Sequence, residues 1–326
     1  MTEPFSDPGA DPVVDPVVDP VVVGTDGSTG ATRAVEWAAD HAGLRGLPLR
    51  VVHAVERLPY DVPRYPIPDS YDRLAPSVRQ ILDHAERIAR DRRPGLDVTT
   101  EPAEGRPGRV LRDQAARAAE VVLGSHGAGG FPGMLLGSVG NHVAGHVAVP
   151  VVVVRPAPPE AVAEIAVGFD CSEASGPALA YAFEEARLRG HRVRIVCAWE
   201  PPVPYAPVIA GDPDDMRRAA EDYARTELQP WQGGNTEVKT ELDMVRGHPV
   251  AALIEASSRA VMLVVGSHGR NAFTAAVLGS VSRAVLAHAH CPVAVVRGAR
   301  SRGEAAGGGE SPEEAGRPHS RDRPLQ

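Results

Sequence analysis

Aromatic residues make up only 4% of this 326-residue sequence, so its cores must be built from aliphatic side chains. Cysteine is also rare, because Cys171, Cys197 and Cys291 are scattered and form no CxxC pair. A sparse, odd set of thiols is typical of a reducing compartment and argues against a disulfide framework. We therefore expect a cytoplasmic protein with aliphatic cores.

Long apolar runs are missing as well, since none approaches the roughly 18 residues that a membrane helix needs. Residues 1–7 contain no basic residue ahead of an apolar stretch, so we expect no secretory signal. The formal net charge is −8, whereas a general nucleic-acid binder needs a basic face to neutralise phosphates. These absences predict no nucleic-acid partner and no membrane association. Lys239 is the only lysine.

The sequence contains an internal repeat, because three segments of its first half recur in its second half. Gly124–Gly127 recurs as Gly266–Gly269, Gly137–Val139 recurs as Gly279–Val281, and Val22–Asp26 corresponds to Ala166–Asp170. The first two pairs are offset by 142 residues and the last pair by 144. Two similar units of roughly 140 residues therefore cover most of the chain. Self-similarity at a nearly constant offset indicates that the same structural unit occurs twice.

Each unit alternates strand and helix patterns. In the first unit we expect strands near 21–25, 49–55, 96–100, 121–123 and 149–154, and helices near 28–45, 70–92, 108–119 and from 138. The second unit repeats this pattern over 165–296. Strands that alternate with helices predict a doubly wound parallel sheet, and continuous valine runs suit strands buried on both faces.

These patterns divide the chain into five parts. We expect a flexible N-terminal arm over 1–18, because its Asp-Pro-Val-Val repeats forbid a regular helix or central strand. The two domains are expected at 19–156 and 164–298, with a linker at 157–163. A disordered tail is expected over 299–326, because that segment is nearly free of apolar residues.

A glycine-serine motif, G-x2-G-x9-G-S, occurs in both units and is formed by Gly124, Gly127, Gly137 and Ser138, and again by Gly266, Gly269, Gly279 and Ser280. Glycines let backbone N–H groups approach a phosphate closely. The Gly-Ser pair precedes a helix, whose N-terminus offers free donors. One such copy could be a turn that only caps a helix, but the repetition at equal spacing favours a phosphate site.

Asp26 and Asp170 directly follow the first strand of each unit. Ligands of open parallel sheets bind at the carboxyl ends of strands, where strand order reverses, so each aspartate is expected to face a glycine loop. A carboxylate there can accept hydrogen bonds from a ribose hydroxyl or an adenine amino group. The alternative is that each aspartate caps the following helix, which does not exclude binding.

On these motifs and on the apolar last strands, Val149–Val154 and Val293–Val296, the sequence resembles the ATP-binding branch of the universal stress protein family over residues 19–156 and 164–298. The resemblance implies a Rossmann-like, adenine nucleotide alpha hydrolase-like fold in each unit, with a five-stranded sheet of order 3-2-1-4-5. It also implies that the two units pair and that the backbone at Ala54 and Ala198 reads the adenine edge.

The resemblance further implies a hydroxyl residue two places after the motif serine. The second unit has Ser282 there, whereas the first has Gly140. We therefore expect the second unit to be the stronger ATP site.

Other site classes fit the residues less well. A Walker-type NTPase needs a lysine in its loop, and neither glycine loop contains one. The residues His126 and His268 stand beside serine, but members of a hydrolytic triad converge from separate segments. The irregular spacing of His288, His290 and Cys291 argues against a metal site. No catalytic residue and no metal ligand is therefore assigned.

The sequence predicts a stress-response protein that binds ATP, with magnesium as its candidate companion, and acts through conformation and an unknown protein partner. At most weak ATP hydrolysis is expected. Two alternatives stay open: a slow ATPase or adenylate-handling enzyme, and a nucleotide-free dimerisation scaffold. Because the apolar fifth strands would lie at sheet edges, we expect the two units to pair within the chain, with a further homo-oligomer also open.

Overall fold

A computed structural model describes residues 18–56, 70–127, 137–200, 212–269 and 278–298. The expected N-terminal arm, apart from residue 18, and the expected tail lie outside the described residues. The first half contains β1 (Val21–Gly24), α1 (Thr29–Arg45), β2 (Leu49–Val55), α2 (Ser70–Arg92), β3 (Val98–Glu104), α3 (Pro107–Ala115), β4 (Glu120–Gly124), α4 (Ser138–His146) and β5 (Val151–Val154).

The second half repeats this order, with a short 3₁₀ turn, η1 (Glu173–Ser175), added after its first strand. Its other elements are β6 (Val162–Gly168), α5 (Gly176–Arg189), β7 (Arg192–Trp199), α6 (Pro213–Gly233), β8 (Thr240–Arg246), α7 (Pro249–Ser257), β9 (Ala260–Gly266), α8 (Ser280–His288) and β10 (Val293–Val296). Strand β6 begins inside the expected linker, because Val162 already pairs with Ala260 of β9.

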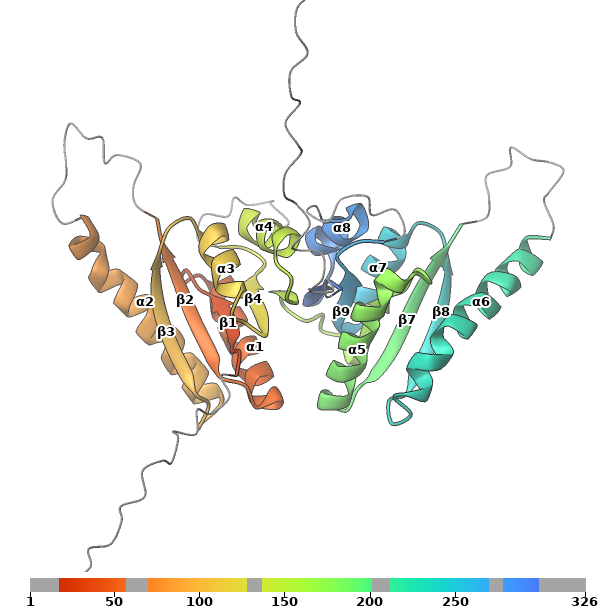
Figure 1. The fold of residues 1–326 in the computed structure, drawn as a ribbon, viewed down its shortest axis with the longest axis horizontal. Coiled ribbons are helices and arrows are strands. Elements are labelled where there is room, and N and C mark those ends of the chain that lie inside the picture. The colour runs from red at the N-terminus through yellow and green to blue at the C-terminus, as the bar shows by residue number, and fades with distance from the viewer. Residues whose placement is uncertain (1–17, 57–69, 128–136, 201–211, 270–277, 299–326) are drawn as a thin grey trace, which may run out of the picture.

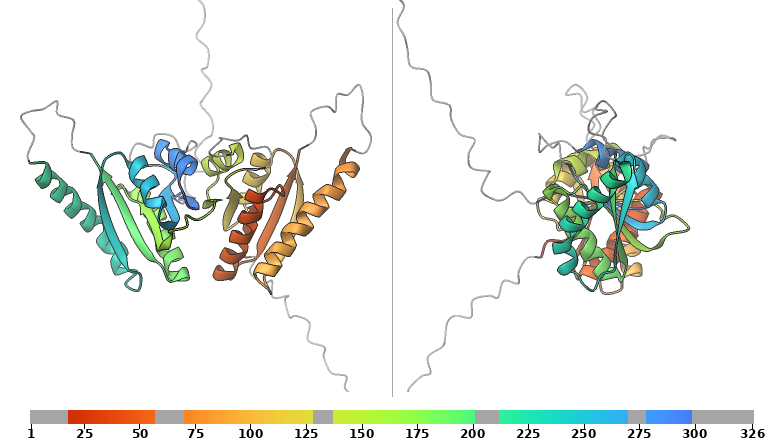
Figure 2. Two further views of the ribbon diagram at one scale, coloured as in Figure 1. Left: turned by 180° about the vertical axis from the view of Figure 1, so that it is seen from behind. Right: turned by 90° about the vertical axis from the view of Figure 1, so that its right-hand side faces the viewer.

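The strands of both halves form one continuous ten-stranded sheet of order β3-β2-β1-β4-β5-β10-β9-β6-β7-β8 (Figure 1). Each half therefore has the order 3-2-1-4-5 that the resemblance implied, and all strand pairs within a half are parallel. The two halves join at their fifth strands, which confirms the expected pairing within the chain. Figure 2 shows helices on both faces of this sheet when it is viewed from behind and end-on.

The alternation of side chains along each strand divides the core into two layers. Val21 and Val23 of β1 contact the layer under α1 and α2, whereas Val22 contacts the layer under α3 and α4. Each layer continues through the second half, under α5 and α6 on one face and under α7 and α8 on the other. Because the strands are buried on both faces, their sequences are continuous valine runs rather than alternating ones.

Local signals fix the ends of the first helix of each half. The Ser28 hydroxyl accepts a hydrogen bond from the amide of Ala31 and so caps the start of α1, as serine commonly does at this position. The helices α1 and α5 end at Gly46 and Gly190, whose φ angles of 65° and 66° are left-handed. Glycine adopts this conformation without the steric cost that a Cβ atom brings.

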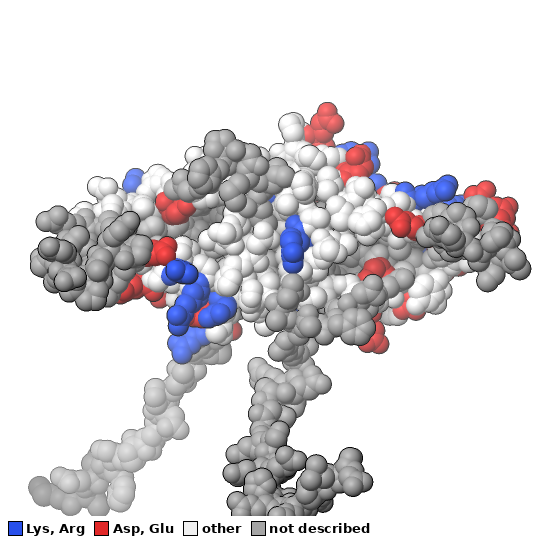
Figure 3. All heavy atoms as spheres, turned by 90° about the horizontal axis from the view of Figure 1, so that it is seen from above, with Lys and Arg blue, Asp and Glu red and all other residues white. Residues whose placement is uncertain are grey.

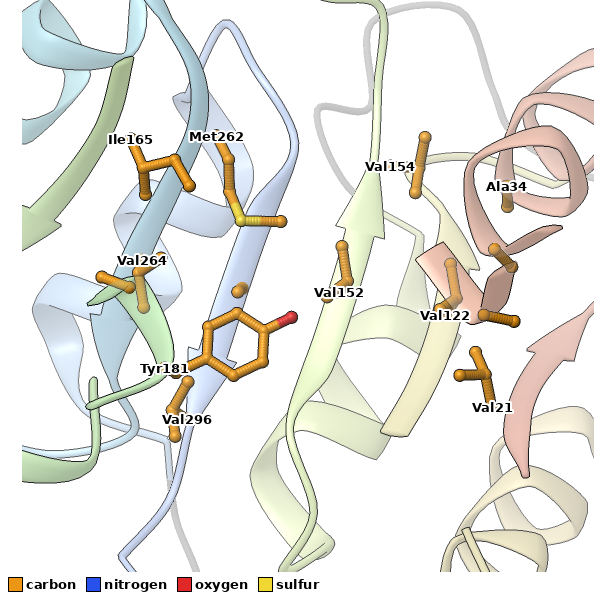
Figure 4. Close-up of a cluster of buried hydrophobic side chains, with 14 of the residues drawn as sticks. Val21, Ala34, Val122, Val152, Val154, Ile165, Tyr181, Met262, Val264 and Val296 are labelled. Carbon is orange, nitrogen blue, oxygen red and sulfur yellow. The ribbon is translucent and has the colours of Figure 1, made fainter. Parts of the chain in front are cut away.

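The junction between the halves is an antiparallel pair of short strands. Val153 pairs with Val293, and Val152 pairs with Ala294. All eight residues of β5 and β10 are buried. In Figure 4, Val152 of β5 and Tyr181 of α5 lie on either side of the junction, within a cluster to which both halves contribute. An apolar edge that would invite aggregation is thereby covered.

A buried polar cluster also lies at the junction, between α1 and α5. The side chains of His41, Glu120 and Glu185 are fully buried. The Nε2 atom of His41 lies 3.2 Å from a carboxylate oxygen of Glu120, and its Nδ1 atom lies 3.4 Å from one of Glu185. The hydroxyl of Tyr181 donates to Glu120 at 2.8 Å. Buried charges of this kind stay ionised only when they are paired.

Two arginines border this cluster. Arg189 donates to Glu185 through Nε at 3.1 Å, and its Nη2 atom lies 3.0 Å from Nδ1 of His41. Arg45 lies 2.6 Å from Glu184 and 3.7 Å from Glu185. Burial alone would lower the pKa of His41, but the charges and hydrogen bonds of the two buried glutamates raise it to about 9.

Within the described part of the chain, none of the helices is long and apolar enough to cross a membrane. All three cysteines are described and none forms a disulfide.

Candidate functional site

Each half has a pocket at the carboxyl ends of its first and fourth strands, with a volume of about 310 Å³ in the first half and about 420 Å³ in the second. The motif residues that line the first pocket are Gly124, Gly127, Gly137 and Ser138, together with Asp26 and Ala54. Those that line the second are Gly266, Gly269, Gly279, Ser280 and Ser282, together with Asp170 and Ala198. The structure thus brings every sequence-predicted site residue to one of two equivalent pockets.

In the first pocket the aspartate lies against the glycine loop. A Cβ atom on Gly127 would lie only 2.4 Å from Oδ2 of Asp26, so a side chain here would force the Asp26 carboxylate to move. The other carboxylate oxygen, Oδ1, accepts a hydrogen bond from the amide of Ser28 at 3.0 Å. Asp26, just after β1, therefore lies directly against the loop after β4.

The second pocket holds its aspartate with more donors. Oδ1 of Asp170 accepts hydrogen bonds from the amide of Ser172 at 3.1 Å and from the hydroxyls of Ser172 and Ser175, each at 2.5 Å. In the first half Ala31 occupies the position that corresponds to Ser175. A Cβ atom on Gly269 would lie 3.0 Å from Oδ2 of Asp170, so the close approach of aspartate and glycine loop recurs.

The helix that starts at each motif serine opens on the pocket. The N-cap residues are Gly137 for α4 and Gly279 for α8, and neither helix has a side-chain cap. The amides of these glycines donate to the carbonyls of Ser125 and Ser267, both at 2.9 Å. Because the first amides of a helix lack partners within it, these N-termini provide donors and a positive dipole end for an anion.

The backbone at Ala54 faces the first pocket. In a parallel strand, alternate residues direct their amide and carbonyl toward alternate neighbours. The carbonyl of Val52 accepts from Thr25, next to β1, and the carbonyl of Val55 accepts from Gly105, next to β3. The amide and carbonyl of Ala54 consequently point toward the side of β1. Because β1 ends at Gly24, opposite Val52, no residue of β1 lies there to pair with them.

Ala198 has the same position in the second half. The carbonyl of Val196 accepts from Phe169, and that of Trp199 accepts from Gly247. Each pocket therefore contains one backbone N–H and C=O pair at the end of the second strand.

The rest of each pocket is an apolar slot, and its walls were not identified from the sequence. They are formed by Val52, Pro107, Leu111 and Leu123 in the first half and by Val196, Pro249, Leu253 and Val265 in the second. The signal that could have found them is the repeat itself, because Pro107 and Leu111 recur as Pro249 and Leu253 at the same offset of 142 as the glycine motif. Seen from above, the centre of this face carries few charged side chains (Figure 3).

The structure shows how Ser282 is held at the second pocket, which it lines. Its side chain is buried, and its hydroxyl donates to the carbonyl of Gly266 at 2.6 Å. This hydrogen bond holds the Ser282 hydroxyl beside the glycine loop, and its contact with a phosphate stays a prediction. Ser282 therefore links α8 to the end of β9. The first half lacks this link, because Gly140 occupies the corresponding position.

The histidine of each glycine loop contacts the preceding serine. Nδ1 of His126 lies 3.0 Å from Oγ of Ser125, and Nδ1 of His268 lies 2.9 Å from Oγ of Ser267. These are contacts between adjacent residues, and Ser267 is buried. The arrangement orients the loop and offers no exposed nucleophile at Ser267.

Comparison with known proteins places this geometry in context. The sequence model of the "Universal stress protein family" matches residues 18–155 and 163–297. "Universal stress protein Rv1996" of Mycobacterium tuberculosis is 34% identical over 305 residues, covering 85% of this chain and 94% of the relative. "Universal stress protein Rv2005c" of the same organism is 35% identical over 286 residues, covering 85% and 96%.

Among solved structures, that of a universal stress protein from Archaeoglobus fulgidus is similar in fold. Its TM-score is 0.64 at 20% identity, and the alignment covers 86% of this chain and 98% of that chain. Similarity over nearly the whole of both chains extends to the tandem arrangement of the two halves.

Proposed function

The chain belongs to the universal stress protein family, and we propose that each of its halves binds one molecule of ATP in the pocket at the carboxyl ends of its strands. The observation that carries this proposal is the pairing, in both pockets, of an apolar slot with an uncapped helix N-terminus. A flat apolar base fits the slot, and a phosphate chain fits the N-terminus. Magnesium is then the ion that accompanies the phosphates.

The backbone groups of Ala54 and Ala198 favour adenine over guanine. A carbonyl can accept from the exocyclic amino group of adenine, and an amide can donate to the neighbouring ring nitrogen. Guanine presents the opposite pattern on that edge, an acceptor oxygen beside a ring N–H. A buried donor facing a donor loses its hydrogen bond and pays its desolvation cost, so the pockets should reject GTP.

The phosphates are expected at Ser138 and Ser280, the first residues of α4 and α8. Both side chains are exposed, so their hydroxyls are accessible to a ligand as additional donors. Asp26 and Asp170 line the same pockets beside the glycine loops and are suited to accept from the ribose hydroxyls.

We further propose that binding itself is the function, and that the chain acts in the cytoplasm by changing its conformation and its contacts with a protein partner when ATP is bound. The support is the chemistry of the pocket rim. The loop histidines contact their own neighbouring serines, and the pocket linings are dominated by glycine and apolar side chains.

The test uses the full chain. Protein purified without added nucleotide is denatured, and the released nucleotide is identified by chromatography and mass spectrometry. Calorimetric titration of nucleotide-free protein with ATP should give two binding events per chain, and GTP should bind at least about tenfold more weakly. A chain that carries no nucleotide and binds neither ATP nor GTP would support the scaffold alternative instead.

Turnover separates the binding protein from the slow enzyme. With bound ATP present, phosphate release should not exceed one equivalent per site during a long incubation. Sustained release that is lost in a variant with substituted pocket residues would show that the chain is an ATPase.

A further inference from the structure

An arginine directly follows the fifth strand of each half and reaches into the other half. Arg155 follows β5, and its guanidinium donates to the carbonyls of Leu286, Ala287 and Ala289. Arg297 follows β10 and donates to the carbonyl of Gly145 at 2.9 Å. The antiparallel pairing of β5 with β10 directs each arginine across the junction.

These carbonyls belong to the C-terminal ends of the two helices that open on the pockets. Leu286 and Ala287 lie in the last turn of α8, and Ala289 is its C-cap residue. Gly145 lies in the last turn of α4. The last four carbonyls of a helix lack partners within it and carry the negative end of the helix dipole, so a guanidinium is a suitable partner for them.

The surroundings of Arg155 indicate that these carbonyls are its main partners. Its side chain is partly buried, and burial lowers its pKa. Within the described residues none of the ion pairs involves Arg155. A charge that is removed from water without a carboxylate must be compensated by dipoles, and here the end of α8 provides them.

The helices are short enough for one end to affect the other. Each has nine residues, or about 14 Å at the usual rise per residue, and helices of this length are marginal without tertiary contacts. A second contact across the junction supports the first. Leu278, which precedes the N-cap of α8, is buried in the same apolar cluster as Val143 and Ala144 of α4.

We propose that each nucleotide site is completed from the other half of the chain. Arg155 of the first half is a positioning residue for the second site, because it holds α8, and Arg297 of the second half is a positioning residue for the first site, because it holds α4. The ligand class is the phosphate chain of an adenine nucleotide, so this inference rests on the proposed function.

The experiment measures the two sites separately in the full chain. Ser138→Glu and Ser280→Glu each place a carboxylate at the start of a helix, where it suits the dipole but repels phosphate. Ser138→Glu leaves the second site open, and Ser280→Glu leaves the first site open. Each background is then combined with Arg155→Gln or Arg297→Gln and titrated calorimetrically with ATP.

The expected pattern is crossed. Arg155→Gln should weaken ATP binding at the second site by about tenfold or more, from the loss of charge-assisted hydrogen bonds, and should change the first site by less than about twofold. Arg297→Gln should do the reverse. Arg155→Lys and Arg297→Lys, which keep the charge, should recover part of the affinity and serve as the readout if a glutamine variant fails to fold.

Equal weakening of both sites by one arginine variant would indicate general destabilisation and overturn the inference, as would no weakening at either. If each serine variant binds one ATP at the site left open while the arginine variants show no crossed effect, only this inference fails. If the unmodified chain binds no nucleotide, the proposed function fails and this inference fails with it.

Discussion

The buried histidine at the junction makes stability depend on pH in a defined window. The pKa of His41 is about 9 in the folded chain against 6.5 for a free side chain. Below pH 6.5 both states bind the proton and the stabilisation is complete. Between pH 6.5 and 9 the unfolded chain loses this proton while the folded chain keeps it, so stability falls with rising pH.

The magnitude follows from the two pKa values. Their difference of about 2.5 corresponds to about 3 kcal/mol of folding free energy that is lost across the window. The ring nitrogens of His41 face Glu120, Glu185 and Arg189, and Tyr181 donates to Glu120 beside them. Burial raises the pKa of Tyr181, so its ionisation weakens the fold only at still higher pH.

The assay is urea denaturation of the full chain at about pH 6 and about pH 9.5, followed by circular dichroism. His41→Gln should lower the free energy of unfolding at the lower pH and flatten its decline toward the higher one. His84→Gln, which changes an exposed histidine on α2, is the matched control and should follow the unmodified chain. Comparison with these variants cancels the contributions of other groups. If the difference between the unmodified chain and His41→Gln were the same at both pH values, the assignment of a protonated, paired His41 would be refuted.

Three further predictions concern the junction, the pocket and the ends of the chain. Val152→Asp with Val295→Asp places charges on the buried strands β5 and β10 and should cost several kcal/mol in thermal unfolding, whereas Val18→Asp at an exposed position should be nearly neutral. Gly127→Ala should weaken ATP binding in the first pocket, since the new Cβ atom would lie 2.4 Å from a carboxylate oxygen. Gly43→Ala, on the exposed side of α1, is the control. If calorimetry gave Gly127→Ala and Gly43→Ala the same affinity for ATP, the site would be contradicted. A chain of residues 19–298 should keep its melting temperature within a few degrees of the full chain, and a large drop would show that an end packs on a domain.

Much of the fold was predictable because its signals are local and occur twice. The valine runs, the glycine motif and the aspartates after the first strands are properties of short segments, and their repetition identified two units. The meeting of Asp26 with Gly127 followed from strand order, because both lie at carboxyl ends of adjacent strands. The apolar fifth strands likewise predicted that the halves join there.

The register and the polar contacts were not predictable in the same way. A slip of two residues between β5 and β10 would leave the same faces buried, so the pairing of Val153 with Val293 depends on contacts outside the strands. The partners of His41 come from β4 and from the other half, and a histidine in an alanine-rich helix gives no sign of them. The hydrogen bond of Ser282 depends on the distance between α8 and β9, which no motif encodes.

The junction also explains why two halves in one chain differ from a pair of identical chains. In a symmetric pair, a residue near the twofold axis meets its own copy. At the offset of 144, position 41 corresponds to position 185, and here His41 faces Glu185. Two copies of the first half would place histidine against histidine, and two copies of the second would place glutamate against glutamate, so the contact between His41 and Glu185 would be lost. The contact between His41 and Glu185 forms only between unlike halves, and it therefore favours their pairing within the chain.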